Sequence, residues 1–166
     1  MTTIMAKIII YSAPIHSGKT SRLKSWLKSK NKLFGFLTPD EDGLRKILNL
    51  ATQELVPWQV EEKNNEATIE VGKYLFLASG FEIAQQILKD FNPQKEGLFV
   101  IDEIGKLELK GQGLEPALSD CIANFIQRPD ESTMIVIVRD YLLEEVMHRY
   151  GLENANIVGH TYFENN

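Results

Sequence analysis

Residues 8–20 of the chain read IIIYSAPIHSGKT. The run begins with four apolar or aromatic residues, Ile8 to Tyr11, a pattern typical of a strand that is buried on both faces of a parallel sheet. A helical pattern comes next, and its apolar face carries Leu23, Trp26 and Leu27. The connection between them ends in Gly-Lys-Thr, as do loops that wrap phosphate groups. The segment therefore predicts a strand, a phosphate-binding loop and a helix in succession.

The predicted loop consists of eight residues, Ala13, Pro14, Ile15, His16, Ser17, Gly18, Lys19 and Thr20. Backbone N–H groups of such a loop surround phosphate oxygens, and the helix that follows points its positive end at them. Lys19 is long enough to reach the β- and γ-phosphates of a nucleotide, and the hydroxyl of Thr20 is a ligand for Mg²⁺. Ala13 replaces the usual first glycine, a small change that should preserve phosphate binding. We expect His16 to point outward without a catalytic role.

A second apolar run, Leu98 to Ile101, is followed directly by Asp102 and Glu103. In enzymes with a phosphate loop, an aspartate after such a strand helps to hold Mg²⁺. A glutamate beside it can orient or deprotonate an attacking water as a general base. Adjacent residues of a strand point to opposite faces, so the two carboxylates should have different roles. The alternative is that the two acids only mark the solvated end of a strand. The phosphate loop in the same chain instead favours a site in which Glu103 is the base.

The rest of the chain alternates strand and helix patterns around an inserted β segment. Further strands are expected at 33–37, 134–138 and 156–159, and helices at 79–91, 114–126 and 140–151. Residues 44–76 instead predict antiparallel strands, with a hairpin around 51–54 and a solvated loop at 61–66. We therefore predict a single α/β domain over residues 1–166: a mostly parallel central sheet flanked by helices, with an antiparallel β-hairpin insertion.

Composition excludes several classes of protein. The length of 166 residues suits one domain, and the net charge of −5 counts against non-specific nucleic-acid binding, which is electrostatic. Apolar runs stay well below the roughly 18 residues of a membrane-spanning helix, and residues 1–7 lack the layout of a signal peptide. Cys121 is the single cysteine, so no internal disulfide can form. We expect a cytoplasmic protein with no nucleic-acid or membrane partner; no protein partner or oligomeric state is indicated.

Together these segments resemble the THEP1-type nucleoside-triphosphatase family over most of the chain. The most specific segment is Ile101 to Leu109, which is close to the family's Asp-Glu-Ile-Gly-Lys-Met-Glu-Leu. Shorter matching segments lie at 13–20, 35–38, 43–45, 71–74 and 81–82. The resemblance implies a RecA-like fold and Mg²⁺-dependent hydrolysis of ATP, GTP and other nucleoside triphosphates to the diphosphate.

Carried over to this sequence, the resemblance implies a role for each matching residue. Lys19 and Thr20 would serve the phosphates and the metal, Asp102 would belong to the metal shell, and Glu103 would activate water. Lys106, just past the base, either touches phosphate or is a surface lysine.

The chain departs from the family pattern in three places. Ala13 replaces a glycine, residues 43–47 lack the second glycine of the family's Gly-x-Arg-x-Gly-Phe, and Asn165-Asn166 lacks the arginine of an Asn-Arg element. We expect these departures to affect base recognition and turnover, and to leave the phosphate chemistry in place.

Two other functions stay open. A small-molecule or nucleotide kinase would need an acceptor pocket, for which residues 44–76 are the candidate segment. Nucleotide kinases also cluster arginines, whereas here they are spread along the chain at Arg22, Arg45, Arg128, Arg139 and Arg149. A nucleotide-binding adaptor with little turnover is the other candidate, and Glu103 counts against it. Four aromatic residues offer a stacking surface for a base but more often fill a core or its rim: Trp26, Trp58, Tyr74 and Phe163.

Overall fold

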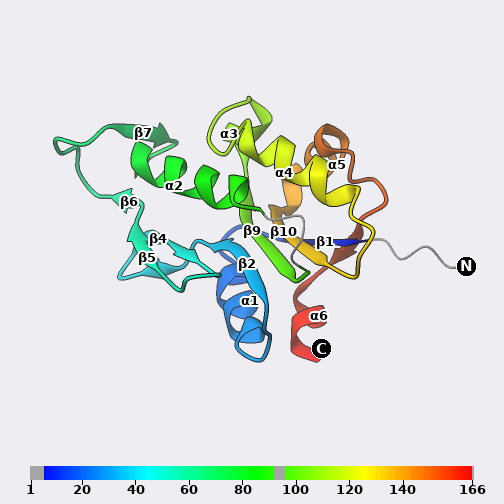
Figure 1. Ribbon diagram of the computed structural model, residues 1–166. Coiled ribbons are helices and arrows are strands. Elements are labelled where there is room, and N and C mark those ends of the chain that lie inside the picture. Colours follow the sequence, from blue (N-terminus) through cyan, green and yellow to red (C-terminus); the bar gives the residue numbers. More distant parts are fainter. Residues whose placement is uncertain (1–5, 92–95, 166) are drawn as a thin grey trace, which may run out of the picture.

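The structure is a computed structural model that describes residues 6–91 and 96–165 (Figure 1). Its centre is an eight-stranded sheet that contains five adjacent parallel strands. Across the sheet these are β11 (Asn156–Val158), β1 (Lys7–Ala13), β10 (Thr133–Arg139), β9 (Leu98–Ile104) and β2 (Leu33–Leu37). The strand before the phosphate loop, β1, and the acidic strand, β9, are thus separated by β10.

The predicted antiparallel insertion is present, but it is divided between two sheets. Its first part extends the central sheet: β4 (Leu44–Asn49) pairs with β2, while β3 (Asp40–Glu41) and β5 (Leu55–Pro57) pair with β4. Its second part is a separate three-stranded sheet of β6 (Gln59–Val60), β8 (Tyr74–Leu77) and β7 (Thr68–Val71), at the left of Figure 1. β4 joins the central sheet because its neighbours Ile47 and Leu48 bury their side chains on opposite faces of that sheet.

Helices cover both faces of the central sheet. One face packs against α2 (Ala78–Lys89), α4 (Ala117–Ile126) and α5 (Leu143–Tyr150), and the other against α1 (Lys19–Leu27) and α6 (His160–Asn165) (Figure 1). Along β1, Ile10 lies in the first core, and Ile9 and Tyr11 lie in the second. Burial on both faces explains why the parallel strands read as nearly continuous apolar runs.

Most predicted elements are confirmed, and the differences have physical reasons. β9 continues through the two acids to Ile104, whereas the sequence analysis ended the strand at Ile101. α4 begins at Ala117 rather than at 114, because Pro116 disfavours the helical conformation of the residue before it, Glu115. The prediction missed the short helices α3 (Lys106–Leu109) and α6, because segments this short cannot display a helical periodicity in their sequence. A 3₁₀ turn, η1 (Asp140–Leu142), precedes α5.

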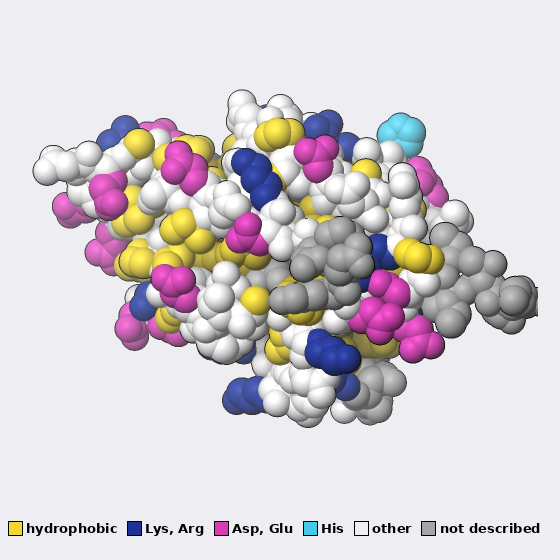
Figure 2. Space-filling view, viewed as in Figure 1, with side chains coloured by type: hydrophobic (Ala, Val, Ile, Leu, Met, Phe, Trp, Pro, Cys, Tyr) yellow, Lys and Arg dark blue, Asp and Glu magenta, His cyan; other side chains and the backbone are white. Residues whose placement is uncertain are grey.

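Two predictions concern residues outside the described ranges. The absence of a signal-peptide layout at residues 1–5 and the Asn166 part of the C-terminal departure fall there. Within the described ranges, no helix is long and apolar enough to cross a membrane. On the face shown in Figure 2, the side chains of Lys and Arg are interspersed with those of Asp and Glu.

Candidate active site

Four parallel strands bring the predicted site residues to one edge of the sheet. The phosphate loop follows β1, Thr38 follows β2, Asp102 and Glu103 lie near the end of β9, and Arg139 ends β10. The carboxyl ends of parallel strands meet at this edge, where ligands of α/β proteins bind. A cavity of about 200 Å³ lies here, and it is lined by residues 15–21 together with Thr38, Asp40, Arg45, Glu103 and Arg139.

The phosphate loop has the backbone that its sequence predicts. Gly18 adopts φ +84° just before α1, a left-handed conformation that glycine reaches without strain. Lys19 is buried, and its Nζ donates hydrogen bonds to the carbonyl oxygens of Ala13 at 3.2 Å and Pro14 at 2.9 Å. Burial lowers the pKa of Lys19, and the charge of Glu103 opposes that effect. The lysine is thus held across the loop, with its side chain lining the cavity.

Asp102 joins the phosphate loop to β9. Its side chain is fully buried, and Oδ2 accepts hydrogen bonds from Oγ1 of Thr20 at 2.8 Å and from the backbone N–H of Thr38 at 2.9 Å. Oδ1 has no hydrogen-bond partner among the described residues. An unpaired buried oxygen is costly, and carboxylate and hydroxyl oxygens are the ligands that Mg²⁺ takes. Asp102 and Thr20 therefore fit the metal role that the sequence predicts for them.

Glu103 has a different environment from its neighbour. Its side chain is 15% exposed, and Oε1 lies 2.8 Å from Nε of Arg139. The N–H at Nε does not point along this line, so the contact is an ion pair rather than a well-aligned hydrogen bond. Burial, and then the charge of Asp102, raise the pKa of Glu103, while Arg139 opposes the rise. A carboxylate with a raised pKa is better suited to accept a proton near neutral pH.

The fold gathers two arginines that sequence analysis treated as scattered. Arg45 and Arg139 both line the cavity that contains Lys19. NH1 of Arg45 lies 3.3 Å from the carbonyl oxygen and 3.1 Å from Oγ1 of Thr38, and donates to both. Arg139 could have been found from its place directly after an apolar strand, which is the signal that identified Asp102. Thr38 gave no such signal, because its contribution is a backbone N–H.

Comparison with known proteins agrees with this site. Residues 8–157 match a protein family described as NTPase. The chain belongs to this nucleoside-triphosphatase family. The matched segment contains the phosphate loop, both acids and both arginines of the cavity.

A solved structure confirms the fold of this NTPase family member. THEP1 from the hyperthermophile Aquifex aeolicus superimposes with a TM-score of 0.63 and 22% sequence identity, over 93% of this chain and 89% of that chain. At this identity the likeness shows the fold, which is the RecA-like phosphate-loop fold with its mostly parallel sheet and antiparallel insertion. A comparison with curated proteins found no match.

Other residues singled out from the sequence lie at the rim of the phosphate cavity of this NTPase or outside it. His16 is exposed at the rim of the cavity, as expected. Lys106 does not line that cavity; its Nζ lies 5.6 Å from the centre of the Tyr141 ring. Among the described residues, none of the four aromatic candidates lines it either. Trp26 packs on Phe163 within the core beside α1.

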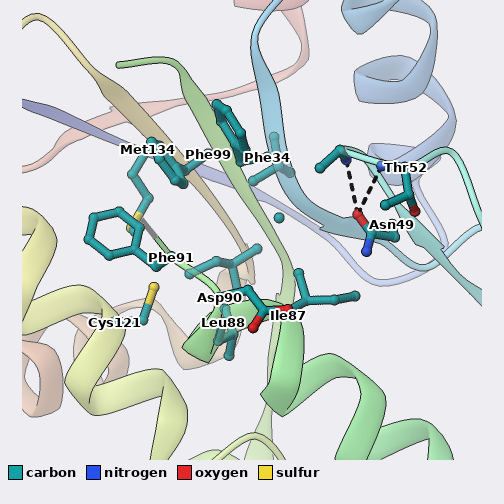
Figure 3. Close-up of a pocket in the computed structure, with 14 residues that line it drawn as sticks. Phe34, Asn49, Thr52, Ile87, Leu88, Asp90, Phe91, Phe99, Cys121 and Met134 are labelled. Atoms are coloured by element: carbon teal, nitrogen blue, oxygen red, sulfur yellow. Dashed lines mark hydrogen bonds between the residues drawn. The ribbon is translucent and has the colours of Figure 1, made fainter. Parts of the chain in front are cut away.

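A separate cavity of about 140 Å³ lies between α2 and the first residues of β2 and β9 (Figure 3). Its wall is largely apolar, with Phe34, Phe99 and Met134 on the sheet side. Its polar Asn49 already accepts hydrogen bonds from the N–H groups of Ala51 and Thr52. This cavity shares no lining residue with the phosphate cavity, so it takes no part in the site.

Proposed function

We propose that this protein hydrolyses nucleoside triphosphates, including ATP and GTP, to the diphosphate and phosphate in a Mg²⁺-dependent reaction. The observation that carries the proposal is the 2.8 Å hydrogen bond from Thr20 to Asp102. It joins the phosphate loop to the acidic strand and leaves Glu103, the next residue, on the wall of the same cavity. Phosphate binding, metal binding and water activation then have their groups within one site.

The triphosphate would be held by the loop and by three cations. Backbone N–H groups of residues 15–18 and the N-terminus of α1 supply partial positive charge. Lys19, Arg45 and Arg139 line the cavity and supply full charges. In phosphoryl transfer these groups stabilise charge on the equatorial and leaving oxygens, which accounts for most of the catalysis.

Thr20 and Asp102 would hold the metal through Oγ1 and the unpaired Oδ1. When bound, Mg²⁺ supplies positive charge that offsets the charge of the β- and γ-phosphate oxygens. The bond from Thr20 to Asp102 keeps the two oxygens together, so the protein holds the ligands in place before nucleotide arrives.

Glu103 would act on the water that attacks the γ-phosphorus. Its carboxylate accepts the proton of that water as the new P–O bond forms. The bond from the γ-phosphorus to the bridging oxygen breaks, and the diphosphate leaves with the electron pair. The ion pair with Arg139 holds the carboxylate toward the cavity. The charge of Arg139 also lowers the pKa of Glu103, which favours the ionised form.

The test is phosphate release from ATP, GTP, CTP and UTP with and without Mg²⁺. Glu103→Gln keeps the shape of the side chain but accepts no proton, so we expect nucleotide binding to persist and hydrolysis to fall by about 10²–10⁴-fold. Asp102→Asn should lower turnover and raise the Mg²⁺ concentration needed for half-maximal rate. The matched control is Glu144→Gln, which changes an exposed glutamate of α5. Wild-type turnover in Glu103→Gln would show that the assigned base is wrong and would favour transfer or adaptor functions.

A further inference from the structure

A second cavity, of about 120 Å³, adjoins the phosphate cavity at Glu103. The two cavities share Thr38, Arg45, Glu103 and Arg139, so a molecule in the second would lie beside a triphosphate in the first. Glu103 stands at the boundary, and a group in the second cavity can therefore reach the atom that we assign as the base. We refer to this space as the acceptor cavity.

The aromatic wall of the acceptor cavity is built by the β insertion and α2. Trp58, between β5 and β6, has its ring centre 4.6 Å from that of Phe76 and 5.1 Å from that of Phe81. A Cβ on Gly80 would lie 2.3 Å from Cδ1 of Trp58, so only glycine allows the indole to lie this close to α2. The ring is held on several sides, and all three aromatic residues line the cavity. A wall of this kind suits a planar ring.

Two residues on this wall carry polar atoms that are buried and have no partner among the described residues. One is Nε1 of Trp58, which can only donate, and the other is Oε2 of Glu108. Glu108 is 5% exposed, and burial raises its pKa to about 7. Buried polar groups are normally paired. Neither atom is accessible from the cavity, because Nε1 lies next to Gly80 and Oε2 next to Gly113, so this wall meets a ligand through its aromatic rings.

We propose that the acceptor cavity binds the acceptor of a phosphoryl transfer, a nucleoside-like molecule with a heteroaromatic ring and a free hydroxyl. The proposal rests on the triphosphate site proposed above. Arg45 and Arg139 would be engaged by the triphosphate, which leaves the aromatic wall, Lys106 and Glu108 for the second molecule. The base at the boundary favours a hydroxyl, whose proton has to be removed, over a phosphate acceptor.

The transfer balances with the groups present. The hydroxyl oxygen of the acceptor forms a bond to the γ-phosphorus as the bond to the bridging oxygen breaks. The diphosphate leaves with that electron pair, and the hydroxyl proton passes to the carboxylate of Glu103. The products are the nucleoside diphosphate and the phosphorylated acceptor. Without an acceptor, water takes the same position and the outcome is hydrolysis.

The first experiment follows the label from ATP carrying ³²P in its γ-phosphate, with adenosine, guanosine, cytidine or uridine added. We expect labelled nucleoside monophosphate with at least one of them, and a matching fall in labelled free phosphate. Glycerol has hydroxyls but no ring, so it should receive no label. Label only in free phosphate with all four nucleosides would overturn the proposal.

The second experiment uses the two tryptophans of the chain as a matched pair. Trp58→Phe reduces the aromatic wall of the acceptor cavity, and Trp26→Phe makes the same change in the core beside α1. We expect Trp58→Phe to raise the KM for nucleoside up to about tenfold, because the smaller ring offers less area for stacking, and Trp26→Phe to leave it unchanged. Acceptor-free phosphate release should be unchanged in both. Equal nucleoside KM values in wild type and Trp58→Phe would contradict the assigned wall.

Phe76→Leu, which removes an aromatic ring from the same wall, is a second variant, should Trp58→Phe fail to fold, and we expect it to raise the same KM. The Trp26→Phe protein keeps Trp58 as its single tryptophan, so quenching of its fluorescence by nucleoside reports occupancy of the cavity directly. Quenching without label transfer would overturn the acceptor role. Label transfer to nucleoside without any acceptor-free phosphate release would support the cavity and overturn the hydrolysis proposal, so the two failures are distinguishable.

Discussion

Asp102 and Glu103 are adjacent in sequence, yet their side chains meet different surroundings. Asp102 is fully buried and receives hydrogen bonds from a side chain and from the backbone. Glu103 lines the cavity and pairs with a cation. One carboxylate is therefore held by two fixed donors, and the other remains beside the space where a nucleophile would lie. This difference at the residue scale suits the separate roles in metal binding and proton transfer that we propose for the two residues.

Lys19→Ala should weaken the binding of triphosphate far more than that of nucleoside. The lost ammonium group contacts phosphate, and a charge-assisted hydrogen bond contributes roughly 1.5–3 kcal/mol. Calorimetric titration of the variant with a non-hydrolysable triphosphate and with nucleoside measures the two affinities. Unchanged triphosphate affinity would remove the assignment of the loop.

Glu108→Gln should stabilise the protein at pH 8 and have little effect at pH 5. Burial raises the pKa of Glu108 from 4.5 to about 7. Between these values the folded state retains a proton that the unfolded chain releases, so wild-type stability falls as pH rises through this range. The neutral amide avoids the loss, which amounts to about 3 kcal/mol.

Urea unfolding of both proteins at pH 5 and pH 8 measures this difference. The exposed Glu144→Gln is again the control and should show no pH-dependent change. A Glu108→Gln effect of equal size at the two pH values would mean that the carboxyl does not titrate in this range.

At the scale of elements, the alignment of β9 with β10 places the base. Asp102 pairs with Ile137 and Ile104 pairs with Val138, so Glu103 has no opposite residue in the ladder. An extra residue of this kind is a bulge, which bends the strand locally and redirects a side chain. β10 runs one residue beyond this point and ends at Arg139, which reaches the redirected carboxylate.

Arg139→Gln should move the acidic limb of the kcat/KM profile to higher pH. Burial and the charge of Asp102 raise the pKa of Glu103, and Arg139 lowers it. Without the guanidinium the pKa rises further, so the base stays protonated, and hydrolysis stays slow, up to a higher pH. Hydrolysis of ATP across pH 5–9 tests this, with the exposed Arg149→Gln as control. A uniform fall in rate with no shift of the limb would indicate that Arg139 acts on the phosphates alone.

At the scale of the whole molecule, the site is an edge of the sheet to which several loops contribute. The phosphate loop, Thr38, the acids and Arg139 come from four neighbouring strand ends. The β insertion contributes Arg45 to this edge and Trp58 to the adjoining cavity. The helices on either face pack against the strands through the two cores (Figure 1).

We expect poor discrimination between ATP and GTP. Every contact that we propose for the nucleotide is directed to phosphate or metal, which all triphosphates share. Strong selection needs buried polar groups that would go unpaired with the wrong base. The kcat/KM values for the two nucleotides should lie within about tenfold, roughly 1.4 kcal/mol. A preference above about a hundredfold would reveal a base pocket, to be sought in residues 44–76 and after Ile157.

The strands and long helices could be predicted because the burial of their side chains produces a recognisable pattern of apolar residues in the sequence. The apolar runs of β1, β9 and β10 mark strands covered on both faces, and the spacing of Phe81, Ala84 and Leu88 marks the buried face of α2. Elements such as α3 are too short to show such a pattern. The division of the insertion between two sheets was missed as well. The residue pattern of an antiparallel strand does not indicate which other strand it pairs with.

The sequence by itself determined the phosphate loop, because its chemistry lies in consecutive residues whose backbone wraps the ligand. It also identified Asp102 and Glu103, which follow an apolar strand directly. Only the tertiary structure decided that Arg45 and Arg139 join them, that Glu103 is displaced in a bulge, and that Trp58 and Glu108 share a cavity. These relations depend on strand order and packing between distant segments, and local sequence carries no record of either.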